Sequence, residues 1–310
     1  MQSHHLRGEG SLQGADGIAL LEVKAFGRLL ISCNGTVVST FPTRKAEELL
    51  AYLFLHQGNP HRRDKLIEIL WPGAPADNGR GRLSTTLWRV RVLLNKLGVS
   101  PDSCLETDSE SVALVAHPHS LIDVSVFQDH IHAAEATSVP EEKESLFRAA
   151  QSLYVGDLLE GIYSEWCLIE RERLARLNLR LLGQLAACYI NRGAYEEAID
   201  TSHKILDIDP LREEVHRSLM LCYGKSGRRC DGIRQFQRCA NLLLKELGIF
   251  PLPETIEIYR SLIATATDEC LDTAADPHYQ QQLQETFSDF MSLGDELVEL
   301  LEGARQPELV

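Results

Sequence analysis

Residues 82–98 read RLSTTLWRVRVLLNKLG, and this stretch decides how the rest of the chain is interpreted. On an α-helix, which turns about 100° per residue, one stripe about 80° wide collects the apolar side chains. These are Leu83, Leu87, Val90, Leu94 and Leu97. A second face collects Arg82, Thr85, Arg89 and Lys96. Gly98 is a suitable terminator just beyond it. The spacing therefore predicts an amphipathic helix over 82–97 that is anchored in a core by its apolar stripe.

The basic face of this helix suits the major groove of DNA. An arginine can donate two hydrogen bonds to guanine, and hydroxyl groups can reach base edges or phosphates. The alternative explanation is a solvated basic face, so the surrounding sequence has to decide. Trp88 lies on a different side of the helix, and we expect it to pack against the sheet or the first helix.

The charge of the chain is unevenly distributed. The formal net charge is −14, which argues against a nucleic-acid partner when taken alone. Residues 19–100, however, carry 12 Lys and Arg against 6 Asp and Glu, whereas residues 101–310 carry 18 against 37. A basic N-terminal region on an acidic body indicates a division of labour between the two parts of the chain.

The segments around this helix follow a recognisable order. Apolar runs over 20–26, 29–33 and 36–38, with the tight-turn pair Asn34-Gly35, predict a small antiparallel sheet. Helical patterns follow over 44–56 and 63–71, and Pro75, Asn78, Gly79 and Gly81 predict a loop before the long helix. Residues 105–107 and 112–115 then flank a turn and predict a hairpin. A sheet, three helices and a hairpin is the order of a winged helix.

Three segments carry a family resemblance: 41–46 (FPTRKA), 63–72 and 87–91 (LWRVR). They resemble the DNA-binding domain of the SARP (antibiotic regulatory protein) activators, which is similar to the effector domain of OmpR-type response regulators. The resemblance implies that 82–97 is the recognition helix and 105–115 the wing. The wing departs from the family pattern, because it carries Glu106, Asp108 and Glu110, which phosphate would repel.

The next part of the chain is helical and repetitive. Five pairs of like residues are separated by 34 positions, the period of tetratricopeptide helix pairs. They are Leu185 and Leu219, Cys188 and Cys222, Tyr189 and Tyr223, Gly193 and Gly227, and Ile199 and Ile233. Trp166 and the strings at 123–127, 156–159, 170–174, 209–213 and 246–251 resemble the bacterial transcriptional activator domain of the same regulators.

We therefore predict a mainly α protein in which a winged helix-turn-helix (α+β) is followed by a tetratricopeptide-like repeat domain. The predicted segments are a flexible arm at 1–17, the winged helix at 18–117, the activator domain at 121–266, and a linker with an acidic amphipathic helix at 267–310. That last helix, within 280–302, either packs back on the repeats or serves as a dimer or protein-docking contact.

Several classes of protein are disfavoured. The sequence has no GxxxxGK[ST], GxSxG or HExxH motif, so we predict no enzyme and no cofactor. The histidine pairs at 4–5, 117/119 and 130/132 lack supporting ligands, so we predict no metal. The eight cysteines show no CxxC pair and are read as reduced thiols of a cytoplasmic protein. No apolar run approaches the roughly 20 residues of a membrane span, so we expect no membrane partner.

Two functions stay open. The first is a sequence-specific transcriptional activator whose partners are double-stranded promoter DNA and RNA polymerase holoenzyme, with a possible homodimer on DNA. The resemblance implies tandem direct repeats as its target, and we expect residues 1–117 alone to keep some DNA affinity. The second is a regulatory tetratricopeptide adaptor whose winged helix contacts protein. The predicted DNA-binding residues are Arg82, Thr85, Thr86, Arg89, Arg91, Lys96, Arg44, Lys45 and Arg63.

Overall fold

The computed structural model describes residues 21–73, 75–115 and 120–264. The predicted arm at 1–17, the linker and acidic helix at 267–310, and the histidines at 4, 5, 117 and 119 lie outside these ranges. The chain divides into two compact units, with the division after Arg192. The predicted domain limits differ from this division and stay predictions.

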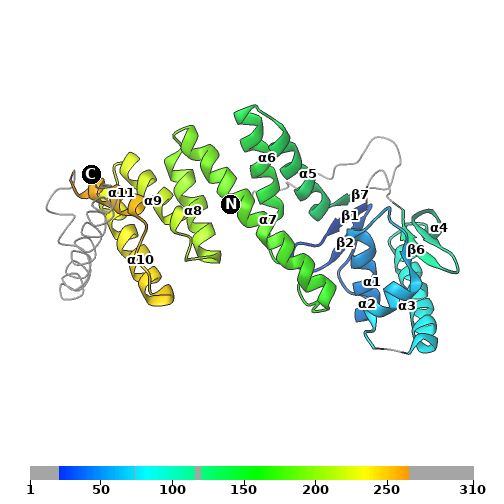
Figure 1. Cartoon of the computed structure of the whole chain (residues 1–310). Coiled ribbons are helices and arrows are strands. Elements are labelled where there is room, and N and C mark those ends of the chain that lie inside the picture. The colour runs from blue at the N-terminus through cyan, green and yellow to red at the C-terminus, as the bar shows by residue number, and fades with distance from the viewer. Residues whose placement is uncertain (1–20, 74, 116–119, 265–310) are drawn as a thin grey trace, which may run out of the picture. The chain divides into compact units, whose positions relative to one another are not determined.

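The N-terminal sheet forms as the sequence predicts, with one additional strand (Figure 1). Strands β1 (Leu21–Lys24), β2 (Leu30–Cys33) and β3 (Thr36–Val38) are antiparallel. The turn between β2 and β3 has positive φ angles at Asn34 (46°) and Gly35 (81°), as a two-residue hairpin turn requires. A strand that was not predicted, β7 (Ser120–Ile122), pairs in parallel with β1, so the order is β3-β2-β1-β7.

Three helices follow the sheet: α1 (Arg44–Leu55), α2 (Arg63–Leu70) and α3 (Ala76–Lys96). The hydroxyl of Thr43 caps α1 by accepting a hydrogen bond from the Ala46 amide at 3.2 Å. The apolar face of α1 is buried: Ala46, Leu49, Leu50, Leu53 and Phe54. In α2, Leu66, Ile67 and Leu70 are buried, whereas Ile69 is only half-buried, because the short helix packs its Ile67 face against α3.

The expected loop before α3 is instead the first turn of that helix. Gly79 is helical, and a Cβ atom at this position would lie 2.3 Å from Cγ2 of Ile67. The glycine is therefore needed for the close approach of α3 to α2 and does not break the helix. The prediction of a loop over 76–81 was wrong because glycine marks both situations in a sequence.

The predicted wing is present as a hairpin. Strands β5 (Leu105–Thr107) and β6 (Ser111–Leu114) pair antiparallel, and β4 (His61–Arg62) adds a third strand beside β6. A one-turn helix, α4 (Pro101–Cys104), leads from α3 into β5. The sheet, three helices and hairpin make the winged helix-turn-helix.

The first compact unit continues into three more helices, α5 (Asp123–Ala136), α6 (Pro140–Leu153) and α7 (Glu165–Asn191). The carboxylate of Asp123 accepts hydrogen bonds from the amides of Ala25 (2.9 Å) and Phe26 (3.0 Å), which follow β1. Phe26 packs edge-on against Phe127, with ring centroids 5.2 Å apart, and against Tyr154. These contacts join the start of the helical region to the winged-helix sheet.

The second unit contains α8 (Tyr195–Ile208), α9 (Glu213–Lys225), α10 (Arg229–Leu247) and α11 (Pro253–Ile263). The predicted repeat glycines, Gly193 and Gly227, both adopt a φ of +79°, so each occupies an equivalent left-handed turn. The predicted pairs Leu185 and Leu219, and Ile199 and Ile233, are buried in each copy. The helical-repeat prediction is confirmed by this equivalence.

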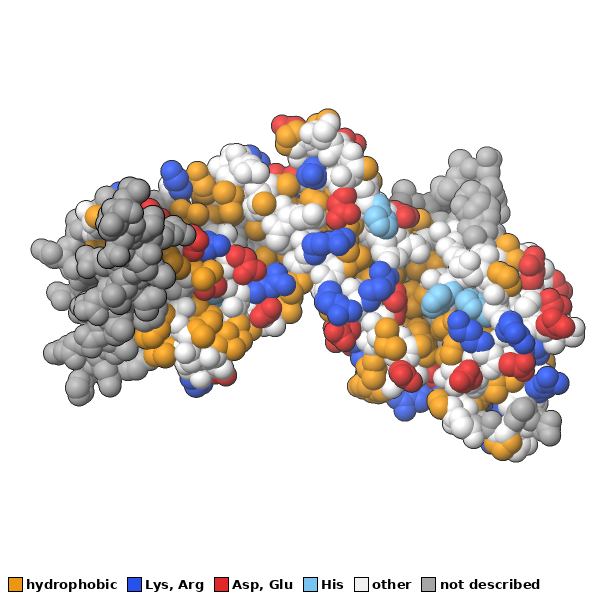
Figure 2. Space-filling model, in the orientation of Figure 1, with side chains coloured by type: hydrophobic (Ala, Val, Ile, Leu, Met, Phe, Trp, Pro, Cys, Tyr) orange, Lys and Arg blue, Asp and Glu red, His pale blue; other side chains and the backbone are white. Residues whose placement is uncertain are grey.

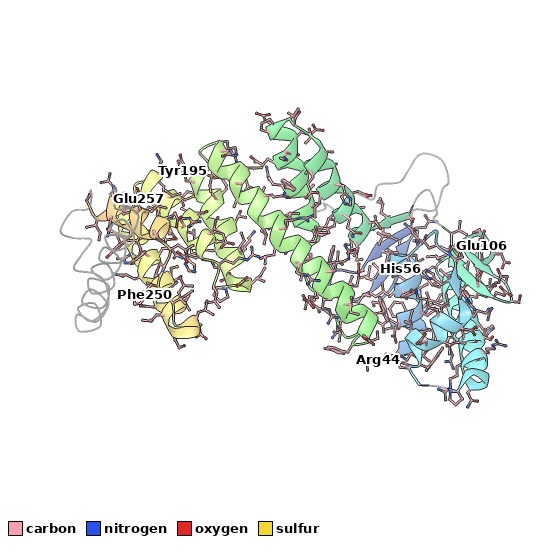
Figure 3. The ribbon with its side chains drawn as sticks, in the orientation of Figure 1. Arg44, His56, Glu106, Tyr195, Phe250 and Glu257 are labelled. Carbon is pink, nitrogen blue, oxygen red and sulfur yellow. The ribbon has the colours of Figure 1, made fainter. Side chains whose placement is uncertain are left out.

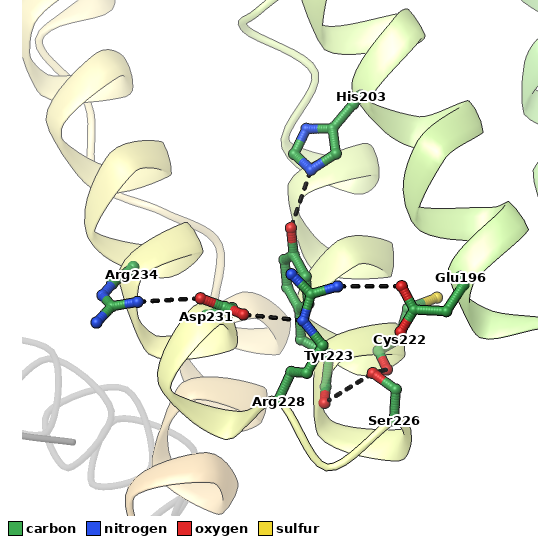
Figure 4. Close-up of polar contacts among 8 residues, drawn as sticks. All are labelled: Glu196, His203, Cys222, Tyr223, Ser226, Arg228, Asp231 and Arg234. Atoms are coloured by element: carbon green, nitrogen blue, oxygen red, sulfur yellow. Dashed lines mark hydrogen bonds and ion pairs between the residues drawn. The ribbon is translucent and has the colours of Figure 1, made fainter. Parts of the chain in front are cut away.

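One cluster of charged side chains in the second unit is paired within the fold (Figure 4). Arg228 contacts Glu196 at 3.0 Å and Asp231 at 2.9 Å, and its guanidinium lies 4.8 Å from the centre of the Tyr223 ring. The Tyr223 hydroxyl is 2.9 Å from Nε2 of His203. One arginine thus links three helices, α8, α9 and α10, through their polar groups.

Two expectations about composition can be compared with the described residues. The described range holds no helix that is both long and apolar enough to cross a bilayer. In the same range no three His, Cys, Asp or Glu side chains gather in a way that could hold a metal ion.

Among the described residues, six cysteines are free thiols: Cys33, Cys104, Cys167, Cys188, Cys222 and Cys239. Cys230 is disulfide-bonded, so the expectation that every cysteine is reduced was wrong.

Candidate nucleic-acid interface

Helix α3 is held rigidly by its apolar stripe. The five side chains predicted to anchor it are all buried: Leu83, Leu87, Val90, Leu94 and Leu97. The helix ends as predicted at Gly98, which has a φ of +78° and donates to the Asn95 carbonyl, while Val99 donates to that of Leu94, both at 3.0 Å. The opposite face of the helix is therefore presented in a fixed orientation.

A hollow of about 530 Å³ lies beside the exposed face of α3. Its lining combines the start of α1, the end of α2 and the N-terminal two thirds of α3, as far as Arg89. The lining residues are Thr43, Lys45, Trp71, Asn78, Gly81, Arg82, Thr85, Thr86 and Arg89. The structure thus brings together five of the nine predicted DNA-binding residues, although they come from two separate segments of the chain.

Three cations of α3 have no partner inside the described part of the molecule. Arg82 and Lys96 are exposed and Arg89 is half-buried. None of the three side chains forms a hydrogen bond or ion pair with another described residue. The hydroxyl of Thr85 is exposed and donates to the Gly81 carbonyl at 3.0 Å. These four residues form the surface on which our proposal rests, and we call it the α3 basic face.

Two predicted residues of α3 are engaged within the fold. Thr86 is only 3% exposed, and its hydroxyl donates to the Arg82 carbonyl at 2.8 Å. Arg91 forms an ion pair with Asp102 at 2.9 Å and donates to the Thr107 hydroxyl at 2.6 Å, which ties α3 to α4 and β5. The rotation of the helix places Thr86 at the core and Arg91 beside the hairpin, so both have structural contacts, and their roles in DNA binding stay predictions.

The three predicted residues outside α3 each have an intramolecular partner. Arg44 donates to the Gly161 carbonyl at 2.6 Å, and Lys45 pairs with Glu48 at 2.8 Å. Arg63 donates to the Asp108 carbonyl at 2.9 Å. Arg44 is exposed at the start of α1, at one edge of the winged helix (Figure 3). Their charges can still attract phosphate, but their side chains also have structural roles.

The hairpin is acidic at the tip. Asp108 accepts hydrogen bonds from the amides of Glu110 and Ser111, both at 2.6 Å, and from the Ser111 hydroxyl at 2.8 Å. The backbone amides of Glu110 and Ser111, in that order, lower the pKa of the Asp108 carboxyl and so favour its charged form. Glu106 projects from β5 (Figure 3), and acidic side chains gather over the hairpin on the face drawn in Figure 2. This hairpin lacks the positive charge that would hold a phosphate backbone.

The prediction for Trp88 was wrong. Its side chain is 63% exposed and packs against neither the sheet nor α1. Val92, one turn later, is 47% exposed. Apolar residue type alone suggested a buried position, but the core stripe of α3 is already filled by aliphatic side chains on the opposite face.

Sequence reasoning also missed a contact between α1 and α7. Glu48 is 5% exposed, and its carboxylate accepts hydrogen bonds from Lys45 (2.8 Å) and from the Trp166 indole (3.2 Å). The Trp166 ring also lies edge-on to Tyr52, with centroids 5.2 Å apart. The only sequence signal was a glutamate among the apolar positions of α1.

Comparison with known proteins identifies the class. Residues 122–263, which include α5 to α11, match the family model of the bacterial transcriptional activator domain. The winged helix followed by this domain is similar to the arrangement of the SARP-type regulators, and the relatives support a SARP-type regulator.

The particular relatives are regulators from actinobacteria. The chain is 28% identical over 264 residues to the regulatory protein AfsR of Streptomyces coelicolor, covering 82% of this chain and 26% of AfsR. It therefore spans about a quarter of the length of that relative. It is 22% identical to the regulatory protein DnrI of Streptomyces peucetius, covering 74% of this chain and 88% of DnrI. All of these relatives are named as regulatory proteins.

One solved structure has the same fold. The chain of Mycobacterium tuberculosis EmbR, solved in complex with a low-affinity phosphopeptide, aligns with a TM-score of 0.67 and 21% sequence identity. The alignment covers 90% of this chain and 72% of the EmbR chain. This likeness supports the winged helix followed by a helical domain.

Proposed function

We propose that the chain is a sequence-specific transcriptional activator that reads double-stranded promoter DNA with α3. The observation that carries the proposal is the α3 basic face: Arg82, Thr85, Arg89 and Lys96 stand on a helix whose other face is fixed in a core. Arginine can pair with both acceptors of a guanine edge, and a rigid helix loses little freedom when it enters the groove.

We assign a role to each predicted residue from its position and from the contacts that its side chain makes. Arg82 and Arg89 line the hollow beside α3 and are assigned to base edges. Lys96 at the end of α3, with Arg44, Lys45 and Arg63, is assigned to phosphates, which need charge more than directed hydrogen bonds. Thr86 and Arg91 are assigned structural roles, for the reasons given by their burial and hydrogen bonds.

The helical region after the winged helix is assigned to protein contacts. Residues 101–310 carry 37 acidic against 18 basic residues, so most of this surface would be repelled by phosphate. We assign to it the contacts with RNA polymerase holoenzyme and with a second protomer on tandem DNA repeats, acting in the cytoplasm. Two winged helices one helical turn apart, about 10–10.5 bp between centres, read more bases than one.

The competing function is a regulatory adaptor whose winged helix binds protein. The acidic hairpin favours it, because Glu106, Asp108 and Glu110 would oppose phosphate in a wing that lies on DNA. An activator must bind DNA with an affinity that depends on salt, whereas the adaptor need not bind DNA at all. A measurement of DNA affinity at several salt concentrations therefore separates the two functions.

The test is a titration of the full-length protein with labelled duplexes from the promoters that neighbour its own gene, at several salt concentrations. The proposal predicts at least one duplex bound on the order of 10³-fold more tightly than a scrambled duplex. It also predicts an affinity that falls linearly with salt on a logarithmic plot. Equal affinity for promoter and scrambled duplexes would contradict the proposal and favour the adaptor.

A further inference from the structure

The centre of the exposed face of α3 is apolar. In helical rotation, Trp88 and Val92 lie opposite the buried stripe of Leu83, Leu87 and Leu94. They are one turn apart, and both are exposed, Trp88 to 63% and Val92 to 47%. An exposed tryptophan and valine in adjacent turns of one helix form an apolar patch that no other described residue covers.

Cations border this patch on one side. Along α3 the chain carries Arg80, Arg82, Arg89, Arg91 and Lys96 against a single acidic residue, Asp77. Arg89 and Lys96 flank the patch on the side of the hollow, and the polar residues Ser84 and Asn95 flank it on the other side. An apolar protein partner would have to desolvate these cations, whereas a polyanion with apolar features would satisfy both kinds of group.

We propose that Trp88 and Val92 read thymine by contacting its 5-methyl group in the major groove. This inference rests on the proposed function, since it assumes that α3 enters DNA. Among the four bases, only thymine presents an apolar group on the major-groove edge. An apolar side chain at the centre of the groove face therefore selects the base that carries the methyl group.

The spacing of the two residues gives the geometry of the site. Four residues of an α-helix rise about 6 Å, and successive phosphates of one DNA strand are about 3.4 Å apart along the axis. The two methyl groups are therefore expected within about two base steps of each other. Arg82 and Arg89, on the adjacent part of the same face, place guanine contacts next to these thymines.

The experiment removes the thymine methyl group from the DNA and, separately, the side chain of Trp88 or Val92 from the protein. The probe is the duplex enriched by full-length wild-type protein from a random-sequence library. In matched copies of this duplex, each thymine is replaced singly by deoxyuracil, which keeps the hydrogen-bonding edge and lacks only the methyl group. Burial of one such group corresponds to about 0.8 kcal/mol, or about a fourfold change in affinity.

Wild-type protein is expected to lose about fourfold in affinity at one or two thymine positions. Trp88→Ala is expected to bind more weakly and to show no further loss at one of them, and Val92→Ala likewise at the other. The matched control is Tyr163→Ala, which removes an aromatic side chain that is 70% exposed outside α3. This control should bind both duplexes as wild type does. Urea unfolding of each variant verifies that it is folded.

The outcomes separate this inference from the proposed function. If the library yields no enriched sequence, the proposed function itself fails. If wild type binds an enriched duplex but tolerates deoxyuracil everywhere, or if Trp88→Ala and Val92→Ala show the same losses as wild type, the thymine contact is wrong while the function stands. Trp88→Ala that keeps DNA affinity but no longer activates transcription would assign this patch to a protein, and would also overturn the inference.

Discussion

Helices α3 and α7 make an instructive pair, because both are long, both are anchored by buried apolar residues and both are rich in arginine. The arginines of α7 and its C-terminal cap have partners inside the fold. Arg171 donates to three backbone carbonyls, and Arg173, Arg176, Arg180 and Arg192 pair with glutamates. Arg82, Arg89 and Lys96 of α3 have no such partner among the described residues. A count of basic residues does not distinguish the two helices, whereas the partners of each cation do.

The largest effect is expected from removing the whole helical region that contains α7. Cutting the chain after residue 117 removes β7 from the sheet, leaves the amides of Ala25 and Phe26 without the Asp123 carboxylate, and leaves buried Glu48 without the Trp166 indole. We therefore expect this fragment to lose cooperative unfolding, and the expectation that residues 1–117 keep some DNA affinity stays a prediction that the same fragment can test. The measurement is circular dichroism during urea titration. A fragment ending at residue 192, which keeps the first compact unit, is the matched control.

The next effect in size concerns Arg171. Its guanidinium donates to the carbonyls of Leu158 (2.8 Å), Leu159 (3.0 Å) and Ile162 (3.0 Å), so Arg171→Ala leaves several buried acceptors unsatisfied. We expect the free energy of unfolding to fall by roughly 3 kcal/mol. Arg82→Ala on α3 is the comparison, and it should change stability by less than about 0.5 kcal/mol. Equal destabilisation by both variants would remove the distinction between the two helices.

On the DNA side, Arg89→Ala is expected to weaken binding to the preferred duplex by about 1–3 kcal/mol and to relax the preference at one base pair. Arg176→Ala is the matched control, because this exposed arginine of α7 pairs with Glu172 at 3.3 Å. It should leave both affinity and base preference unchanged. Competition binding against duplexes with single base-pair changes measures both quantities. A loss that is uniform across all duplexes would assign Arg89 to phosphate instead.

The smallest effect is expected at the hairpin. Changing Glu106, Asp108 and Glu110 to the corresponding amides removes negative charge near the basic helix, and Asn at 108 keeps a side-chain oxygen for the turn amides. If the hairpin lies near phosphate, non-specific affinity should rise by a few-fold and its salt dependence should steepen. If neither quantity changes, the hairpin faces away from DNA. The measurement is a titration with scrambled duplex at two or more salt concentrations.

The sequence was sufficient for the elements whose pattern has one physical interpretation. The apolar stripe of α3, the Asn34-Gly35 turn and the equivalent glycines at 193 and 227 all form as predicted. It was insufficient where a residue type serves two purposes. Gly79 permits close helix packing in place of a break, and Trp88 is exposed although its type is usually buried.

The candidate site shows the same limit. Helical spacing grouped Arg82, Thr85 and Arg89 correctly on one face, since that depends only on the rotation per residue. It could not show that Arg91 pairs with Asp102 or that Arg63 donates to the Asp108 carbonyl, because these partners depend on how the elements pack. Which cations are free to bind a ligand is therefore a property of the tertiary structure.

The most direct test of the account compares two triple variants, one with substitutions on α3 and the other with substitutions on α7. One full-length variant carries Arg82→Ala, Arg89→Ala and Lys96→Ala on α3, and the other carries Arg173→Ala, Arg176→Ala and Arg180→Ala on α7, so each loses three positive charges. Both are titrated against the preferred and scrambled duplexes over a range of salt concentrations. The account predicts that the α3 variant loses its preference and much of its salt dependence, while the α7 variant retains both. Equal losses in the two variants, or a preference retained by the α3 variant, would contradict it.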